Sequence, residues 1–253
     1  MLPVNFADFD PTRFQSLRVG GFDNDGIDSC HLLVSRCPEG KGTSIGLHTH
    51  VSDQFYFTLT GKMNFQLYDK IYQVRPNTLV FIPAGAPHWN FNTNPEEEIH
   101  VEMIIPGTRP GFPLAMAVKI DKEAEPAEDP EQNYIRPVDM EKFDLTKFSV
   151  QTLATRETGS SNCRINIACV PAGKAGPPLH THPVDQIYYV LTGTMNVQIG
   201  NEKFTAGPNT YVFLPRGVPH CNWNETDEPE THLVIFVPET SKYEAQSQSI
   251  YLS

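Results

Sequence analysis

The segment 179–197 carries two histidines one residue apart, followed four residues later by a glutamine. Side chains of a β-strand point alternately to its two faces, so His180, His182 and Gln186 have the parity to project to one side. A third histidine, His220, follows 34 residues after Gln186. Imidazole nitrogens bind first-row transition metals. Three imidazoles and one amide oxygen on one side of a β-structure therefore predict a metal site.

The same arrangement occurs 132 residues upstream, without a gap. Aligning residues 48–92 with residues 180–224 gives 23 identities in 45 positions, which indicates an internal duplication. Neither copy has lost a ligand, which argues against a relic pocket in one of them. The duplication predicts one divalent transition metal ion (Fe, Mn, Ni, Co, Cu or Zn) in each copy, with the ligands His48, His50, Gln54 and His88 in the first and His180, His182, Gln186 and His220 in the second.

Length and composition indicate a soluble protein of two ordinary domains. The chain has 253 residues, and the duplication divides it into two units of roughly 100 residues, each large enough for its own core. Its 22 prolines and 17 glycines favour short strands and turns over helices. No apolar stretch approaches the ~18 residues that a membrane span requires. The first eight residues lack the pattern of a signal peptide, so a cytoplasmic location is the default expectation.

The net charge and the cysteines limit the classes of binding partner and the cellular compartment that we expect. A formal net charge of −11 argues against nucleic acid and anionic membranes, because both attract basic surfaces. The five cysteines are odd in number and form no Cys-x-x-Cys pair, which indicates free thiols in a reducing compartment. We therefore expect a small-molecule substrate as the partner. A homodimer is compatible with the sequence but does not follow from it.

Short apolar runs recur every 8–12 residues, which is typical of all-β sandwiches and barrels. In the first copy we expect strands at 54–60, 63–67, 79–82 and 99–105, with a turn at Pro76-Asn77. A proline-rich and acidic stretch between the copies has little apolar periodicity and is interpreted as a connector. The expected organisation is an N-terminal barrel domain at 1–106, a connector at 107–141, a C-terminal barrel domain at 142–238 and a tail at 239–253.

The ligand motifs resemble those of the cupin superfamily in its two-domain, bicupin form. Its first motif is matched by Gly42, His48, His50 and Gly61, with Gln54 in the position where glutamate is usual, and its second by Pro83, Gly85, His88 and Asn92. The second copy repeats the matches at His180, His182, Gly193, Pro215, Gly217, His220 and Asn224, with Gln186 for the glutamate and Lys174 for the leading glycine. The resemblance spans most of the chain and implies two tandem jelly-roll, or double-stranded β-helix, barrels.

The glutamine ligand is the informative departure from the family motif. A ligand set without a carboxylate leaves the ion its full charge, which makes it a stronger Lewis acid and favours anionic ligands. Glutamine also cannot take up a proton, so a general base must be another group. His100 and His232, each twelve residues past the last ligand histidine, are the catalytic candidates, with a structural or surface role as the alternative. This combination also resembles the cupin hydroxynitrile lyases, in which a histidine lies near the metal.

Five further residues are candidate substrate contacts, namely Tyr56, Tyr188, Asn90, Asn222 and Arg216. The tyrosines share the parity of the glutamine ligands, and the asparagines share that of the histidine ligands. Packing or hydrogen bonding within the core is the alternative for these four. Arg216 stands on the loop before His220, where the first copy has Ala84, so it could hold an anion at one mouth only. Exposure on the surface is its alternative.

Three functions compete on this basis. The resemblance to flavonol- and diketone-cleaving cupins implies a metal-dependent dioxygenase that cleaves a C–C bond of an enolisable substrate with O2. In those relatives the ligand glutamate helps to deprotonate the substrate, a function that glutamine lacks. The second candidate is a redox-neutral lyase, isomerase or cyclase that uses the same metal. The third is a non-catalytic binding or storage cupin, although storage relatives usually lack the ligands that both copies keep here.

Overall fold

The computed structural model describes residues 1–253 except 22–26, 110, 129–132, 240–247 and 250–253. Its described part is nearly all β, with 3-10 helices at Phe6–Asp8 (η1), Met140–Lys142 (η2) and Arg156–Thr158 (η3). The chain forms two compact units. We call Phe6–Val138 the N-terminal unit, and Asp139–Ser253 together with Met1–Asn5 the C-terminal unit. Among the described residues, no helix has the length and hydropathy that a membrane crossing requires.

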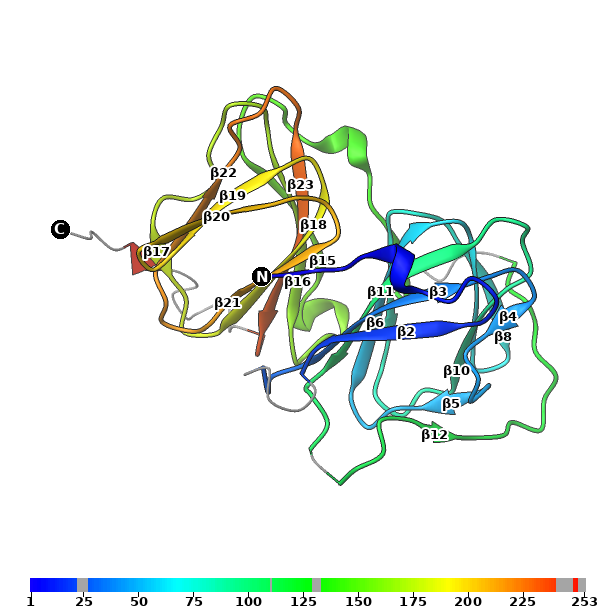
Figure 1. Ribbon diagram of the computed structural model, residues 1–253. Coiled ribbons are helices and arrows are strands. Elements are labelled where there is room, and N and C mark those ends of the chain that lie inside the picture. Colours follow the sequence, from blue (N-terminus) through cyan, green and yellow to red (C-terminus); the bar gives the residue numbers. More distant parts are fainter. Residues whose placement is uncertain (22–26, 110, 129–132, 240–247, 250–253) are drawn as a thin grey trace. The chain divides into compact units, whose positions relative to one another are not determined.

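The N-terminal unit consists of two sheets, antiparallel except where β13 joins β8 (Figure 1). The first sheet has the order β14-β9-β6-β11-β3-β2, with the bounds Ile135–Pro137, Thr78–Ile82, Asp53–Thr60, Glu98–Ile105, His31–Cys37 and Gln15–Gly20. The second has the order β12-β5-β10-β7-β8-β13, with the bounds Met116–Ala117, His48–Thr49, His88–Asn92, Met63–Leu67, Lys70–Val74 and Glu125–Pro126, and β4 (Lys41–Gly42) also pairs with β10.

The C-terminal unit repeats this plan. Its first sheet has the order β1-β21-β18-β23-β16-β15, with the bounds Leu2–Pro3, Thr210–Leu214, Asp185–Thr192, Glu230–Val237, Arg164–Val170 and Ser149–Ala154. Its second has the order β20-β19-β22-β17-β24, with the bounds Glu202–Ala206, Met195–Ile199, His220–Trp223, His180–Thr181 and Gln248–Ser249. Every strand of the first sheet has a counterpart at the same position in the N-terminal unit. The predicted all-β fold with two tandem barrels is confirmed.

Local signals place the strands of the first copy to within one residue of the expected ranges. Asn77 has a φ of 58° in the turn between β8 and β9, as its tolerance of the left-handed region predicts. Gly61, with a φ of 66°, joins β6 to β7. A Cβ atom on Gly61 would lie 2.3 Å from the carbonyl oxygen of Glu97, so this turn requires glycine for its conformation and for its space.

The unit boundaries differ from those expected. The stretch interpreted as a connector contributes β12, β13 and β14 to the sheets of the N-terminal unit. At the start of the chain, β1 pairs with β21 in the position that β14 has beside β9. These strands of two or three residues are held by main-chain hydrogen bonds to a sheet edge, which require no apolar periodicity. Of the expected tail, β24 pairs with β17, and most of the rest lies outside the described residues.

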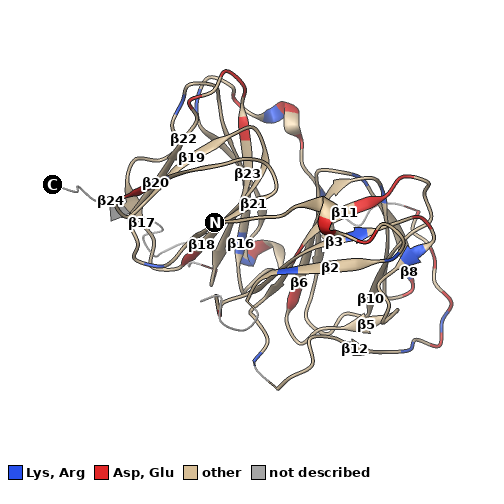
Figure 2. Cartoon of the chain, viewed as in Figure 1, with Lys and Arg blue, Asp and Glu red and all other residues tan. Residues whose placement is uncertain are grey.

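Both polar and apolar side chains point into the interior of each barrel, because burial alternates along the strands. Along β10, His88, Asn90 and Asn92 are buried and the residues between them are half-buried, which confirms the expected parity. The apolar interior is made by equivalent side chains in the two units, such as Tyr56 and Tyr188. Acidic residues also stand inside the central strands β11 and β23 (Figure 2). Such buried carboxylates are rare without a polar partner, and they lead to the sites.

Candidate metal centres

Strand pairing brings the ligand segments together. In the N-terminal unit β5 pairs with β10, which sets His48 opposite His88. In the C-terminal unit β17 pairs with β22 and sets His180 opposite His220. The loop before β10 is tied to the first ligand segment, because the Gly85 amide donates a 2.8 Å hydrogen bond to the carbonyl oxygen of His50. The proline- and glycine-containing loop thereby fixes the height at which the third histidine enters its strand.

The three histidines of each unit converge, as their spacing predicts. In each trio, one ring nitrogen of every histidine lies within 4.8 Å of the corresponding atoms of the other two. The ring centroids of His48, His50 and His88 are 4.3–5.2 Å apart. The Nε2 atoms of His180 and His182 are 3.0 Å apart. All six side chains are buried. Within each trio the ring nitrogens are spaced as the ligands of one ion are.

Backbone carbonyl groups determine which ring nitrogen faces each centre. Nδ1 lies 2.5–2.9 Å from a carbonyl oxygen in the pairs His48–Gly46, His50–Leu114, His88–Ala86, His180–Pro178 and His220–Val218. A carbonyl oxygen only accepts hydrogen bonds, so Nδ1 carries the proton and Nε2 keeps its lone pair. Histidine ligands of metals are held in this way by the nitrogen that does not bind the ion.

Several polar atoms of the two centres are buried without a hydrogen-bond partner. They are Nε2 of His50, His88 and His220, and Oε1 of Gln54 and Gln186. A buried acceptor that lacks a partner costs about 1–3 kcal/mol, and a bound cation would remove that cost. The two glutamine oxygens are therefore unsatisfied buried acceptors, as the three imidazole nitrogens are. The residues of each unit fit a divalent transition metal ion, as the sequence predicts.

Burial keeps the imidazoles in the form that binds metals. It lowers the pKa of His50 and of His220 to about 4. It also lowers the pKa of His88 well below its ordinary value, and a charge on His48 would lower it further. A neutral imidazole offers its lone pair to a cation without first releasing a proton.

Comparison with protein families supports the same conclusion. The model of the cupin domain family matches residues 39–105 and 166–237, which together make up more than half of the chain. The chain belongs to the cupin family. Because each match contains the ligand segments of one unit, the protein is a bicupin with one cluster of three histidines per cupin domain. A search of curated proteins gives no match.

Solved structures share the bicupin architecture. An oxalate decarboxylase has a TM-score of 0.74 at 14% identity, over 99% of this chain and 79% of that chain. An oxalate decarboxylase from Bacillus subtilis studied for its Mn(II) centres has a TM-score of 0.72 at 14% identity, with the same coverage. A cupin 2 conserved barrel domain protein from Leptotrichia buccalis has a TM-score of 0.62 at 14% identity, over 93% and 95% of the two chains. At this identity the likeness establishes the fold, and the reaction has to be argued from the site.

A cavity of about 390 Å³ adjoins the N-terminal centre of this bicupin, and His48, His50 and Glu102 are among its lining residues. Glu102 is buried on β11, and its Oε1 accepts a 2.6 Å hydrogen bond from Nε2 of Gln54. Burial raises the pKa of Glu102, although His100 opposes that shift. Sequence reasoning missed this carboxylate. Its signal was one acidic residue inside the apolar run 99–105, at a position where the second copy has valine.

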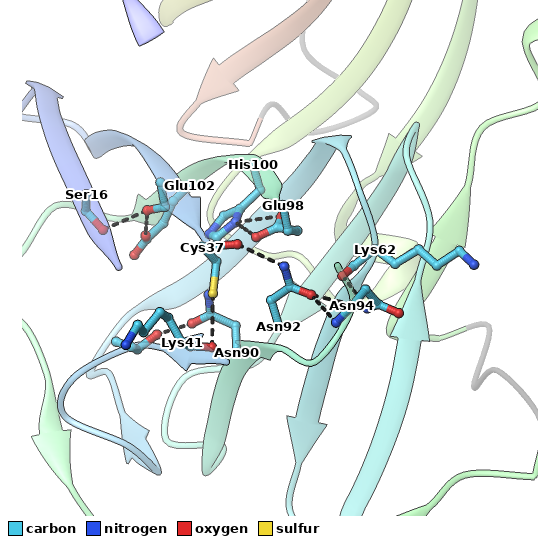
Figure 3. Close-up of polar contacts among 12 residues, drawn as sticks. Ser16, Cys37, Lys41, Lys62, Asn90, Asn92, Asn94, Glu98, His100 and Glu102 are labelled. Atoms are coloured by element: carbon cyan, nitrogen blue, oxygen red, sulfur yellow. Dashed lines mark hydrogen bonds and ion pairs between the residues drawn. The ribbon is translucent and has the colours of Figure 1, made fainter. Parts of the chain in front are cut away.

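Glu102 ends a chain of hydrogen bonds that begins at Ser16 (Figure 3). The hydroxyl of Ser35 donates to Oε2 of Glu102 at 3.1 Å. Oγ of Ser16 lies 2.7 Å from Oγ of Ser35. Because the Ser35 proton is used toward the carboxylate, Ser16 is the donor in this pair. Both oxygens of Glu102 are thereby held in place, one by Gln54 and one by the serine pair.

The C-terminal centre lacks this chain entirely. Val150 pairs with Ala168 as Ser16 pairs with Ser35, and Val234 faces Tyr188 as Glu102 faces Tyr56, so the equivalent positions are Val150, Ala168 and Val234. Three polar residues in one unit thus correspond to three apolar residues in the other. The two centres share their ligand types and differ in their surroundings.

The two candidate base histidines are buried and held by glutamates. Nδ1 of His100 lies 2.9 Å from Glu98, and Nδ1 of His232 lies 2.9 Å from Glu230. Burial lowers the pKa of His100, but Glu98 and more weakly Glu102 outweigh this effect and leave the pKa raised. His232 lines the C-terminal cavity, whereas His100 does not line the N-terminal one. The catalytic role of both stays a prediction, and His100 could act only through another group.

Four of the five predicted substrate contacts line the cavities. Tyr56 and Asn90 line the N-terminal cavity, and Tyr188 and Asn222 line the C-terminal one. Nδ2 of each asparagine is a buried donor without a partner. Arg216 does not line either cavity, and its side chain is 69% exposed. Arg216 is thus exposed on the surface, which is the alternative stated for it in the sequence analysis.

Proposed function

We propose that the protein is a metal-dependent enzyme whose N-terminal centre removes a proton from a small enolisable substrate and supports cleavage of a C–C bond by O2. The supporting observation is the buried carboxylate of Glu102, which lines the cavity and accepts a hydrogen bond from Gln54. In the flavonol- and diketone-cleaving cupins that the motifs resemble, a ligand glutamate helps to deprotonate the substrate. Here the carboxylate stands next to the ligand, so a proton acceptor is kept while the ligand set stays neutral.

In the N-terminal centre, separate residues would hold the metal ion, bind the substrate and accept its proton. His48, His50, His88 and Gln54 would hold the ion, which supplies a Lewis acid that makes a proton next to a substrate carbonyl group more acidic. Nδ2 of Asn90 is an unpartnered donor on the cavity wall and binds a substrate oxygen. Glu102 accepts the proton. Ser35 keeps the carboxylate directed toward the substrate by its hydrogen bond to Oε2.

This assignment concerns one centre only. The C-terminal centre has Val234 where the N-terminal centre has Glu102, and none of the described residues that line its cavity is acidic. Proton removal by a carboxylate is therefore proposed for the N-terminal centre. It favours substrates that arrive neutral and lose a proton in the site, such as 1,3-diketones and flavonols.

The test begins with anaerobic purification and identification of the bound metal. O2 consumption is then measured with an oxygen electrode on a panel of 1,3-diketones and flavonols. We expect O2 uptake that matches substrate loss, and we expect Glu102→Gln to reduce turnover at least about 100-fold while both ions are retained. The matched variant Val234→Ala should leave turnover intact.

Two outcomes would change the proposal. Turnover without O2 uptake would replace the dioxygenase by a redox-neutral lyase or isomerase. Protein that holds no metal and cannot be reconstituted with any divalent ion would overturn both enzymatic readings.

A further inference from the structure

The C-terminal centre adjoins a cavity of its own, about 180 Å³ in volume. Apolar and aromatic side chains dominate its lining, among them Phe148, Val150, Val234 and Phe236. The ligand residues His180, His182 and Gln186 line the same cavity. A closed apolar cavity of about 150 Å³ is large enough to bind one benzene molecule. The C-terminal cavity thus has room for a single ring with a small substituent, and its volume is less than half that of the N-terminal cavity.

The polar groups of this cavity match an anion better than a neutral molecule. None of the described residues that line it is acidic, and the four ligands predicted for its metal include no carboxylate. An ion held by such ligands keeps its full charge and favours an anionic ligand. Asn222, 2% exposed, adds a buried Nδ2 donor without a partner. A ligand with acceptor oxygens would satisfy that donor and the charge together.

The N-terminal cavity differs at the two positions that matter most for this argument. Glu102 and Ser16 line it, and the equivalent positions in the C-terminal cavity are Val234 and Val150. A carboxylate beside the metal ligands repels a ligand that is already an anion. Valine at that place removes the repulsion and adds apolar surface for a ring. Other differences run the other way. Asn166 replaces Leu33, and Asn166 accepts a 3.4 Å hydrogen bond from Arg164. Arg13 and Arg18 line only the N-terminal cavity.

We propose that the C-terminal domain binds an aromatic acid with a single ring. The ring packs among Phe148, Val234 and Phe236, and the carboxylate meets the histidine–glutamine cluster and Nδ2 of Asn222. This site is distinct from the proposed catalytic centre. It rests on metal binding in the C-terminal domain and not on the reaction of the N-terminal domain. The two halves of the duplicated protein would therefore recognise different classes of molecule.

The test uses the full chain with the N-terminal centre removed by His48→Ala and His88→Ala. This protein is loaded with Co²⁺ and titrated with benzoate and with acetate, and the readouts are the visible absorption of Co²⁺ and the heat of binding. We expect benzoate to bind at least tenfold more tightly than acetate. Val234→Glu, which restores the acid of the other domain, should reduce benzoate binding at least tenfold.

Two controls test whether the preference for benzoate comes from the apolar wall of the C-terminal cavity. Phe148→Ala changes a half-buried residue at the cavity and should weaken benzoate binding but not acetate binding. The mirror protein, with His180→Ala and His220→Ala, keeps only the N-terminal centre and should show no preference for benzoate. Equal affinities for the two acids, or a benzoate preference that persists in the mirror protein or in Val234→Glu, would overturn the inference. So would a C-terminal centre that binds no Co²⁺, a result that leaves O2 uptake by the other domain untouched.

Discussion

Gln54 donates a hydrogen bond from Nε2 to Oε1 of Glu102 at 2.6 Å, and this contact determines which end of the amide is left for a metal ion. The NH2 group of an amide only donates, and its oxygen only accepts. With Nε2 held by the carboxylate, Oε1 is left buried and without a hydrogen-bond partner. Glu102 therefore orients Gln54, a predicted ligand, and also lines the N-terminal cavity.

Replacing Glu102 by valine, the residue of the second copy, should weaken the N-terminal metal site. The variant removes the acceptor that orients Gln54, and loss of a residue that supports a metal ligand costs about 10- to 100-fold in affinity. Glu102→Gln keeps an acceptor oxygen and should retain the ion. Competition with a chelator measures both affinities. A Glu102→Val protein that holds its ion as tightly as the wild type would show that Gln54 is oriented by something else.

The two histidine clusters should contribute separately to metal content. We expect close to two transition metal ions per chain, one in each domain, because each cluster brings three buried imidazoles together, and Nε2 of His50, His88 and His220 has no hydrogen-bond partner. His48→Ala should lose one ion, His180→Ala the other, and the combined variant both. Elemental analysis of the four proteins is the measurement. A single variant that loses both ions would show that the centres depend on each other.

The two histidine trios could be predicted from sequence because period-two alternation is local and the duplication repeats the same spacing 132 residues later. Glu102 could not be assigned in the same way. Its importance depends on the register of β11 against β6, which places it beside Tyr56 and within reach of Gln54. Residue parity alone gives two faces for a strand and does not say which face meets the cavity. The sequence does show that the second copy has valine in place of Glu102. The significance of that difference follows only from the contact between Glu102 and Gln54.

The strands formed by the expected connector show a different limit. β12, β13 and β14 are two or three residues long and carry no alternating apolar pattern. They exist because β5, β8 and β9 offer unpaired main-chain groups at the edges of their sheets. The carbonyl oxygen of Leu114, in the same stretch, also anchors Nδ1 of His50. A segment that composition marks as a linker thus helps to orient a metal ligand.

The buried pair of His100 and Glu98 should make stability depend on pH. The pKa of His100 is raised in the fold, so the pair stabilises the protein fully below the unfolded-state pKa of about 6.5. This contribution is lost as the pH rises through the folded-state pKa. Glu98→Gln should therefore cost more at pH 6 than at pH 9, with a loss of about 1.5–3 kcal/mol at the lower pH, as for a hydrogen bond to a charged group. Urea denaturation at the two pH values measures it.

The control for that experiment is Glu97→Gln, which removes a half-exposed ion pair with Arg36. An exposed pair of this kind contributes about 0–1 kcal/mol, so this variant should be nearly neutral at both pH values. If Glu98→Gln cost the same at pH 6 and pH 9, His100 would not change its charge in the fold between these two pH values.

The turn at Gly61 should tolerate alanine far less well than the left-handed turn at Gly40. Gly40 has a φ of 69°, and a Cβ atom added there would meet no other atom within 4 Å, so Gly40→Ala should cost only about 1–2 kcal/mol for the left-handed backbone. Gly61 has a similar φ of 66°, but its added methyl group would lie 2.3 Å from the carbonyl oxygen of Glu97. Overpacking adds about 1–3 kcal/mol to the backbone cost.

The difference between these two alanine variants isolates the steric term, because the backbone term is common to both. Urea denaturation should rank Gly61→Ala as the less stable protein. The clash also bears on the N-terminal centre, since Gly61 directly follows β6, which carries Gln54, and Glu97 directly precedes β11, which carries Glu102. Moving these two strands apart would lengthen the contact between Gln54 and Glu102. Gly61→Ala should therefore also weaken metal binding in the N-terminal domain, whereas Gly40→Ala should not, and equal metal affinity of the two variants would show that the turn and the centre are mechanically independent.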